Sequence, residues 1–124
     1  MLIGKNSLIK ITFQIFKKKI TEASFIYPYA NRKARYALIR GKSESIITDS
    51  SYFNYRDKLN YNDDELSFFE PYISYLMSYL SLEALEKGQT FYKAKNSTKF
   101  NIKRIEVIDK KIQNKKLKNI LARA

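Results

Sequence analysis

The chain of 124 residues contains no cysteine and no histidine. The lack of cysteine excludes disulfide bonds and thiolate metal sites, and it leaves the cellular compartment open. The lack of histidine excludes the usual zinc ligand sets, the Ser-His and Cys-His nucleophile pairs and an imidazole general base. Catalysis would have to depend on carboxylates, lysine, tyrosine or a hard metal ion. We therefore expect a protein that is not an enzyme and carries no cofactor.

Glycine, proline and long apolar runs are also scarce. With three Gly and two Pro, the chain has no flexible linker, and we expect a single domain over residues 1–124. Three lysines follow the apolar residues near the N-terminus instead of preceding them, which is not the pattern of a secretory signal. No apolar run approaches the roughly 20 residues of a membrane span. We expect a location inside a cell or within a macromolecular particle.

Charge is abundant and is divided into three blocks. The basic N-terminal arm, residues 1–42, has ten Lys/Arg against Glu22, and the basic C-terminal block, residues 89–124, has eleven against two acids. The acidic centre, residues 43–88, has three against nine. Two basic blocks favour a polyanion partner, because each Lys or Arg that contacts a phosphate releases a counterion. The acidic centre could also pair with the arms of its own chain or of a neighbouring copy.

The hydrophobic pattern predicts a helix-rich α+β fold with two or three main helices and a few short strands. Residues 8–16 alternate apolar and polar side chains and are rich in β-branched and aromatic residues, which predicts a strand. A helix is the alternative, because Leu8, Ile11 and Ile15 also fit helical turns. Two further short strands are predicted at residues 44–48 and 90–95.

Three segments have the apolar spacing of helices. The first two begin at Pro28 and Pro71 and are followed by Gly41 and Gly88, as expected for helix starts and stops. The third is a basic amphipathic segment at the C-terminus, with isoleucine at helical spacing. The predicted helices cover residues 28–40, 71–87 and 103–120.

The helix at 71–87 has two notable faces. One is an apolar stripe typical of a core helix, from Ile73 to Ala84. The other is a ladder formed by Tyr72, Tyr75 and Tyr79, which suits a subunit interface or base stacking, because phenol rings bury area at low entropic cost and keep a polar tip. The alternative is a ladder that borders the core with its hydroxyl groups in water.

Acidic residues cluster at the end of a predicted loop over residues 49–62. Clustered oxygen ligands could bind Mg²⁺. We favour a simpler role for Asp63 and Asp64, because acids ahead of an apolar run cap a helix and complement its dipole. The candidate ligands are Asp57, Asp63, Asp64 and Glu65.

The first functional hypothesis is a non-enzymatic, basic structural component of a large assembly, such as a ribonucleoprotein or virus particle, that contacts nucleic-acid backbone without reading sequence. Its predicted contacts lie in both basic blocks. They are Lys17, Lys18, Lys19, Arg32, Lys33, Arg35, Arg40, Lys103, Arg104, Lys110, Lys111, Lys115 and Lys116.

The main alternative is a protein-only oligomeric adaptor or ring subunit, or a small inhibitor protein. In that case the acidic centre of one copy meets a basic helix of the next, and the tyrosine ladder is the buried interface. A metal-dependent nuclease is the least favoured alternative, because no spacing of acids matches a known ligand set.

Overall fold

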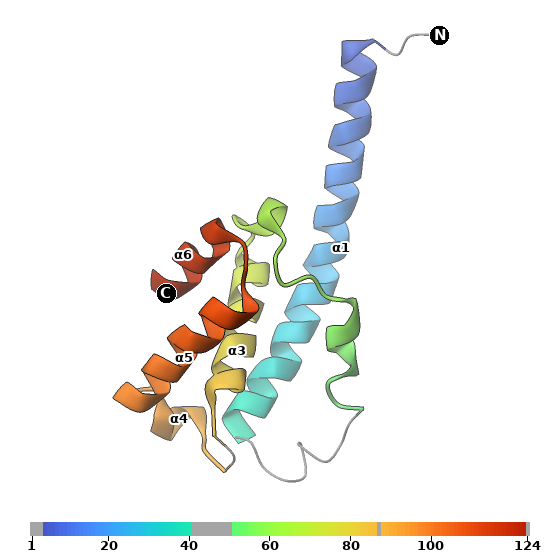
Figure 1. Cartoon of the computed structure of the whole chain (residues 1–124). Coiled ribbons are helices and arrows are strands. Elements are labelled where there is room, and N and C mark those ends of the chain that lie inside the picture. Colours follow the sequence, from blue (N-terminus) through green and yellow to red (C-terminus); the bar gives the residue numbers. More distant parts are fainter. Residues whose placement is uncertain (1–3, 41–50, 87, 124) are drawn as a thin grey trace.

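In this computed structural model, which describes residues 4–40, 51–86 and 88–123, every regular element is helical. The expected α+β class is therefore wrong, and the described residues form an all-α fold (Figure 1). None of these helices combines the length and hydrophobicity needed to cross a bilayer. The elements are α1 (Lys5–Arg40), the 3-10 turns η1 (Asn54–Lys58) and η2 (Asp64–Leu66), α3 (Glu70–Ala84), α4 (Phe91–Ala94), α5 (Thr98–Lys111) and α6 (Lys115–Arg123).

The strand predicted at residues 8–16 is instead the first half of α1. Alternation at period two was a misleading signal, because Ile9, Phe13 and Phe16 also recur at helical spacing and continue into the buried face of the same helix. The helix predicted at 28–40 is the second half of α1. Pro28 lies inside α1 and not at its start. A buried alanine-rich face from Ala23 onward offsets the backbone hydrogen bond that proline cannot donate.

The other two predicted strands have different outcomes. Residues 90–95 contain the short helix α4, because the side chain of Thr90 accepts a hydrogen bond from the backbone N–H of Lys93 at 3.4 Å and caps the turn. The prediction at 44–48 lies outside the described residues. The predicted loop at 49–62 includes the turn η1 in its described part.

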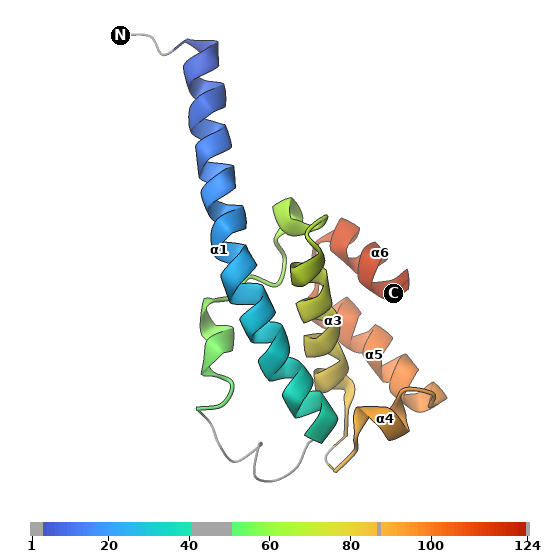
Figure 2. The same cartoon turned by 180° about the vertical axis from the view of Figure 1, so that it is seen from behind.

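Helix α3 confirms the helix predicted near residues 71–87 and is the centre of the fold. It lies between α1 on one side and α5 on the other, as both views show (Figures 1 and 2). Leu76, Leu80 and Ala84 from its predicted stripe are buried, and so are its tyrosines. A helix that packs on both sides must be apolar nearly all round, which explains why two different faces looked suited to burial.

The predicted C-terminal helix is two helices. It is broken after Lys111, where Ile112 has extended backbone angles and a fully buried side chain. The side-chain oxygen of Asn62 accepts hydrogen bonds from the backbone N–H groups of Gln113 and Asn114, at 2.6 and 2.9 Å. Asn114 then caps α6 by accepting a hydrogen bond from Leu117 N–H at 3.0 Å. This break turns α6 back onto the body, where Leu117 is buried.

Candidate binding surfaces on helices α1, α5 and α6

The acidic residues considered as magnesium ligands are separate from one another or occupied by protein groups. Asp63 is buried, and its carboxylate accepts a hydrogen bond from the backbone N–H of Glu65 at 3.2 Å, so it caps η2. Capping by Asp63 was expected, but it serves this short turn and not α3. Asp57 and Asp64 are exposed. Across the described ranges, no group of three or more acidic side chains could hold a metal ion.

The lysine cluster in α1 is divided between solvent and an internal ion pair. Lys17 and Lys18 are exposed. The ammonium group of Lys19 lies 2.8 Å from a carboxylate oxygen of Asp63 and 3.1 Å from one of Glu65. Burial lowers the pKa of Lys19, but the hydrogen bonds to the two carboxylates outweigh it and leave that pKa above its usual value. Lys19 therefore joins α1 to η2 and is not free for phosphate.

The second basic group of α1 is mostly exposed. The side chains of Arg32, Arg35 and Arg40 lie in solvent. Lys33 is half-buried, and its ammonium group lies 4.8 Å from the ring centre of Tyr52. The hydroxyl of Tyr52 also donates a 2.6 Å hydrogen bond to the backbone carbonyl of Lys33. We conclude that Lys33 helps to attach the segment before η1 to α1, whereas the three arginines are available to a partner.

The C-terminal basic residues are exposed along α5 and α6, with two exceptions, Arg104 and Lys118. Arg104 is half-buried, and its guanidinium donates to the backbone carbonyl of Leu121 at 3.5 Å, which connects the two helices. Lys118 is also half-buried and forms a 2.9 Å ion pair with Asp109. The exposed members of the predicted set are Lys103, Lys110, Lys111, Lys115 and Lys116.

These basic groups do not merge into one surface. Helix α1 and the α5–α6 pair lie on opposite sides of α3 (Figures 1 and 2). Helix α3, which belongs to the acidic centre, is thus the middle layer between the two basic ones. Part of that centre pairs with the outer layers, through Lys19 on one side and through Lys99, which lies 3.0 Å from Glu86, on the other. The internal pairing that the sequence left open therefore occurs at these residues.

The structure places the tyrosine ladder in the core and not at an interface. Tyr72 and Tyr75 have no exposed area and Tyr79 is 7% exposed. The hydroxyl of Tyr72 donates to the backbone carbonyl of Asn60 at 2.7 Å and accepts from Asp63 N–H at 3.1 Å. Tyr75 shares a 2.9 Å hydrogen bond with the hydroxyl of Tyr61. Residues before α3 cover this face and supply hydrogen-bond partners to the hydroxyl groups of Tyr72 and Tyr75, which the helical pattern alone could not show.

Burial raises the pKa of all three ladder phenols, because the charged phenolate loses its hydration. For Tyr79, burial and then the negative charge of Glu83 raise the pKa to about 12. The rings stay neutral at physiological pH, so they act in packing and hydrogen bonding and not as acids or bases.

A half-buried arginine is a feature that sequence reasoning missed. The guanidinium of Arg56 lies 4.2 Å from the ring centre of Phe53 and 4.9 Å from that of Tyr79, and its Nη1 donates to Glu83 at 3.0 Å. It is one of only three basic residues in the acidic centre. That isolation among acids and aromatic residues was the available signal for a structural role.

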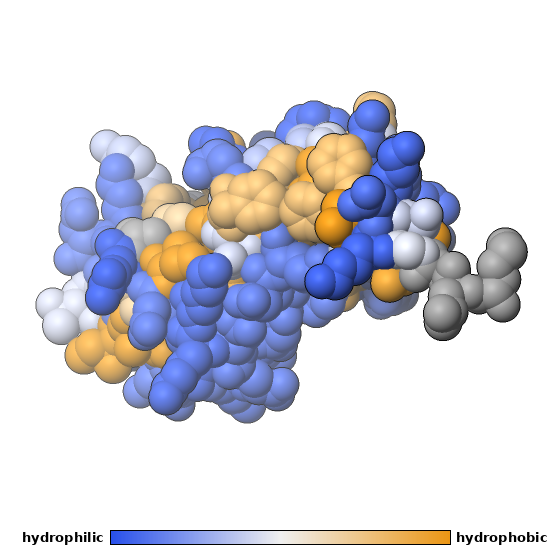
Figure 3. All heavy atoms as spheres, turned by 90° about the horizontal axis from the view of Figure 1, so that it is seen from above, coloured by the Kyte–Doolittle hydropathy of each residue, from blue (hydrophilic) through white to orange (hydrophobic). Residues whose placement is uncertain are grey.

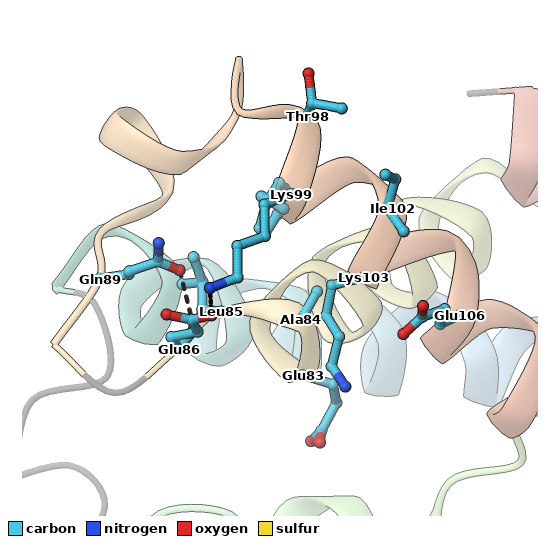
Figure 4. A pocket seen from close by; sticks show the side chains of 11 residues that line it. Glu83, Ala84, Leu85, Glu86, Gln89, Thr98, Lys99, Ile102, Lys103 and Glu106 are labelled. Carbon is cyan, nitrogen blue, oxygen red and sulfur yellow. Dashed lines mark hydrogen bonds and ion pairs between the residues drawn. The ribbon is translucent and has the colours of Figure 1, made fainter.

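A surface pocket of about 520 Å³ lies between the end of α3 and α5 (Figure 4). Its floor is apolar, with Ala84 and Leu85, and charged groups of both signs surround it. Lys99 reaches across it to Glu86, as the dashed line in Figure 4 shows. Because opposite charges are mixed around this pocket, it does not favour an anionic or a cationic ligand.

Sequence analysis also missed that the first half of α1 projects beyond the body (Figure 1). Every residue from 4 to 15 is exposed. This projecting segment, residues 5–18, presents large apolar side chains together with lysines. Seen from above, hydrophobic atoms gather in a band at this end of the molecule, bordered by hydrophilic atoms (Figure 3). The exposed apolar residues are Leu8, Ile9, Ile11, Phe13 and Ile15.

Comparisons with protein-family models, with curated proteins and with solved structures give no match to this chain, so its candidate surfaces are assessed on their own geometry and charge.

Proposed function

We propose that this protein is a non-enzymatic structural component that contacts nucleic-acid backbone through the outward side of α1. The observation that carries this proposal is the charge of one continuous helix. Its 36 residues include nine lysines and arginines against one acid, Glu22, a net charge of +8. Part of this helix packs on α3 and part, near Lys33, on the segment around η1, while the side that carries Lys10, Lys17, Arg32 and Arg35 is exposed.

Four exposed cationic residues of α1 have nearby directions around the helix axis, within about 60° at 100° per residue. They spread over 25 positions, or about 37 Å at 1.5 Å per residue. Phosphates along a duplex supply one negative charge per about 1.7 Å of its axis, so a row of this length can meet several of them. Lys and Arg contacts of this kind fix position and do not read bases. The row consists of Lys10, Lys17, Arg32 and Arg35.

The exposed lysines of α5 and α6 form a second basic surface on the opposite side of the body. Lys110, Lys111, Lys115 and Lys116 belong to it. A component with basic surfaces on two sides can contact two nucleic-acid segments at once, as a subunit inside a ribonucleoprotein or virus particle would. The proposed setting is accordingly the interior of a cell or of such a particle.

The test is the salt dependence of binding to a fluorescent duplex DNA and a fluorescent RNA, followed by anisotropy. With about five phosphate contacts, the logarithm of affinity falls with the logarithm of salt concentration at a slope of about −4 on duplex DNA. Replacing Arg32 and Arg35 by Gln should make this slope shallower by about two, because each lost contact removes about one unit.

The matched control replaces Lys93 and Lys95 by Gln, which removes the same charge from exposed positions at α4. This control should leave the slope near the wild-type value, because neither residue lies on α1. A flat salt response of the wild-type protein would contradict the proposed function. Equal losses in both double variants would show that total charge, and not the α1 row, controls binding.

A protein-only adaptor is the second candidate function. The specific observation in its favour is the uncovered apolar surface of the projecting segment, since exposed apolar patches mark interaction sites. The tyrosine ladder has no part in this version, because its rings are buried within one chain.

A further inference from the structure

A line of mostly apolar residues, which we call the seam, runs along α1. It extends toward the N-terminus beyond the part of α1 that the rest of the protein covers. Its residues are separated alternately by four and three positions, which is the a/d spacing of a coiled coil. From Ala23 onward the seam is buried against the core, whereas Ile9 and Phe13 are 65% and 61% exposed. The seam residues are Ile9, Phe13, Phe16, Ile20, Ala23, Tyr27, Ala30, Ala34 and Ala37.

The covered part of the seam shows which kinds of side chain pack against α1. There α3 supplies the apolar contacts, and η2 supplies acids beside the seam. Lys19 lies next to the seam residue Ile20, and it is paired with Asp63 and Glu65 at 2.8 and 3.1 Å. An apolar helix, together with the carboxylates of the turn that precedes it, thus already covers this part of α1 within the chain.

The uncovered part of the seam has lysines on both flanks and no acids beside them. Lys10 and Lys17 directly follow the seam residues Ile9 and Phe16, and Lys5 lies toward the other flank. No acid occurs between residues 4 and 21. In paired helices the residues beside the seam select the partner. Flanks that carry lysine and no acid repel an identical helix and attract one with Glu or Asp at the facing positions.

The shape at the base of the projecting segment also favours a helix over a flat surface. The seam faces the side of α1 on which the body lies, because its lower part is buried there (Figure 1). Phe68 is 67% exposed beside the seam, with its ring centre 6.2 Å from that of Phe16. A bilayer laid along the seam would meet the body at this point. A helix, at about 10 Å wide, is narrow enough to follow the exposed seam alone.

We propose that the projecting segment, residues 5–18, binds an acidic amphipathic helix of a partner protein, which extends the seam that α3 covers below it. Ile9, Phe13 and Phe16 supply the apolar contacts, and Lys10 and Lys17 pair with carboxylates of the partner. The segment spans about 20 Å, enough for about four turns of the bound helix. Arg32 and Arg35 lie beyond this site, whereas Lys10 and Lys17 are shared with the row proposed to contact nucleic acid, so replacing Ile9 and Phe13 tests the helix site without removing a cation of that row.

The experiment uses the full-length protein and two fluorescent designed peptides of three heptads each. Both peptides carry Leu and Ile at the seam positions; one has Glu and the other Lys at the flanking positions. The Glu peptide is expected to bind and the Lys peptide to fail. Replacing Ile9 and Phe13 by Ala should weaken binding of the Glu peptide by about tenfold or more, because it removes central apolar contacts.

The matched control is a double alanine variant at Phe25 and Ile39, which are also exposed on α1 but lie off the seam. It should bind the Glu peptide as the wild-type protein does. Both double variants change only exposed residues, and unchanged circular dichroism would show that each remains folded.

Three outcomes would overturn the proposal. In the first, neither peptide binds, or both bind equally. In the second, light scattering shows that the protein alone dimerises and that the Ile9 and Phe13 changes abolish the dimer, so that a second copy occupies the seam. In the third, vesicles of phosphatidylserine and phosphatidylcholine bind through Ile9 and Phe13 while the Glu peptide does not.

Discussion

The hydroxyl groups of buried tyrosines connect the aromatic core of this protein to the segment before α3 by hydrogen bonds. A buried phenol must find a hydrogen-bond partner, since an unpaired polar group in the core costs free energy. Tyr72 meets this requirement with two backbone groups of the segment that precedes α3, at Asn60 and Asp63. The rings therefore supply packing area, and their hydroxyl groups fix the path of the chain before α3.

Replacing Tyr72 by Phe should lower the free energy of unfolding by about 1–3 kcal/mol. The ring is kept, but the backbone carbonyl of Asn60 and the N–H of Asp63 lose a buried partner. Urea denaturation measures the change. The control is Tyr92→Phe at an exposed ring, which should change stability by less than about 0.5 kcal/mol. Equal effects of the two changes would show that the hydroxyl of Tyr72 is not structurally important.

At the residue scale the sequence predicted charge and exposure better than it predicted partners. It identified the arginines of α1 as exposed cations, and the structure leaves Arg32, Arg35 and Arg40 in solvent. It could not show that Lys19 is already paired, because its partners are 44 and 46 residues away along the chain. Contacts over such distances depend on tertiary packing, which local spacing does not encode.

At the scale of the elements, the error at residues 8–16 follows from a true ambiguity. The alternation of apolar residues in this segment matches the pattern of a strand. The spacing of Ile9, Phe13 and Phe16 in the same segment also matches the pattern of a helix. The continuation of that spacing past Ile20 into the alanine-rich half was the signal for one long helix. Pro28 obscured it, because proline usually marks a helix start and here lies inside.

Small side chains let α1 approach α3 closely. Four alanines on one face of α1 are buried in the same cluster as the three ladder tyrosines of α3, so small residues face large ones. Interdigitation of this type gives interiors their high packing density. The four alanines are Ala23, Ala30, Ala34 and Ala37.

Replacing Ala34 by Leu should therefore destabilise the protein by about 1–3 kcal/mol, because the site has no exposed area and no room for three more carbon atoms. Thermal and urea unfolding would measure the loss. The same change at Ala122, which is exposed in α6, serves as the control and should be close to neutral. A stable Ala34→Leu protein would mean that the two helices are not packed as described.

At the scale of the whole molecule, the acidic helix α3 lies between the basic helix α1 and the basic pair α5–α6. The sequence predicted the three blocks and left open whether the acidic centre pairs within the chain. The structure shows such pairs at Lys19 and Lys99, and it leaves most of the cations of α1, α5 and α6 exposed. Layer order depends on which faces of α3 are covered, and this helix is apolar on more than one face.

The buried phenols also make the stability of the folded protein depend on pH in alkaline solution. An exposed or unfolded tyrosine has a pKa of about 10. In the folded protein burial raises the pKa of Tyr72, Tyr75 and Tyr79, to about 12 for Tyr79. A raised folded-state pKa means that the unfolded chain releases these protons first. The stabilising effect is complete below pH 10 and is lost as the pH rises through the folded-state values.

We therefore expect the free energy of unfolding to fall steeply between pH 10 and about 12, by up to about 1.4 kcal/mol per pH unit for each buried phenol. Lys19 acts in the same direction, because its ion pairs raise its pKa and are lost when it deprotonates. Urea denaturation at successive pH values measures the slope. Tyr79→Phe should make it shallower, because one titrating group is removed, while Tyr92→Phe at an exposed ring should not. Stability that stays constant up to pH 12 would contradict the buried state of the ladder.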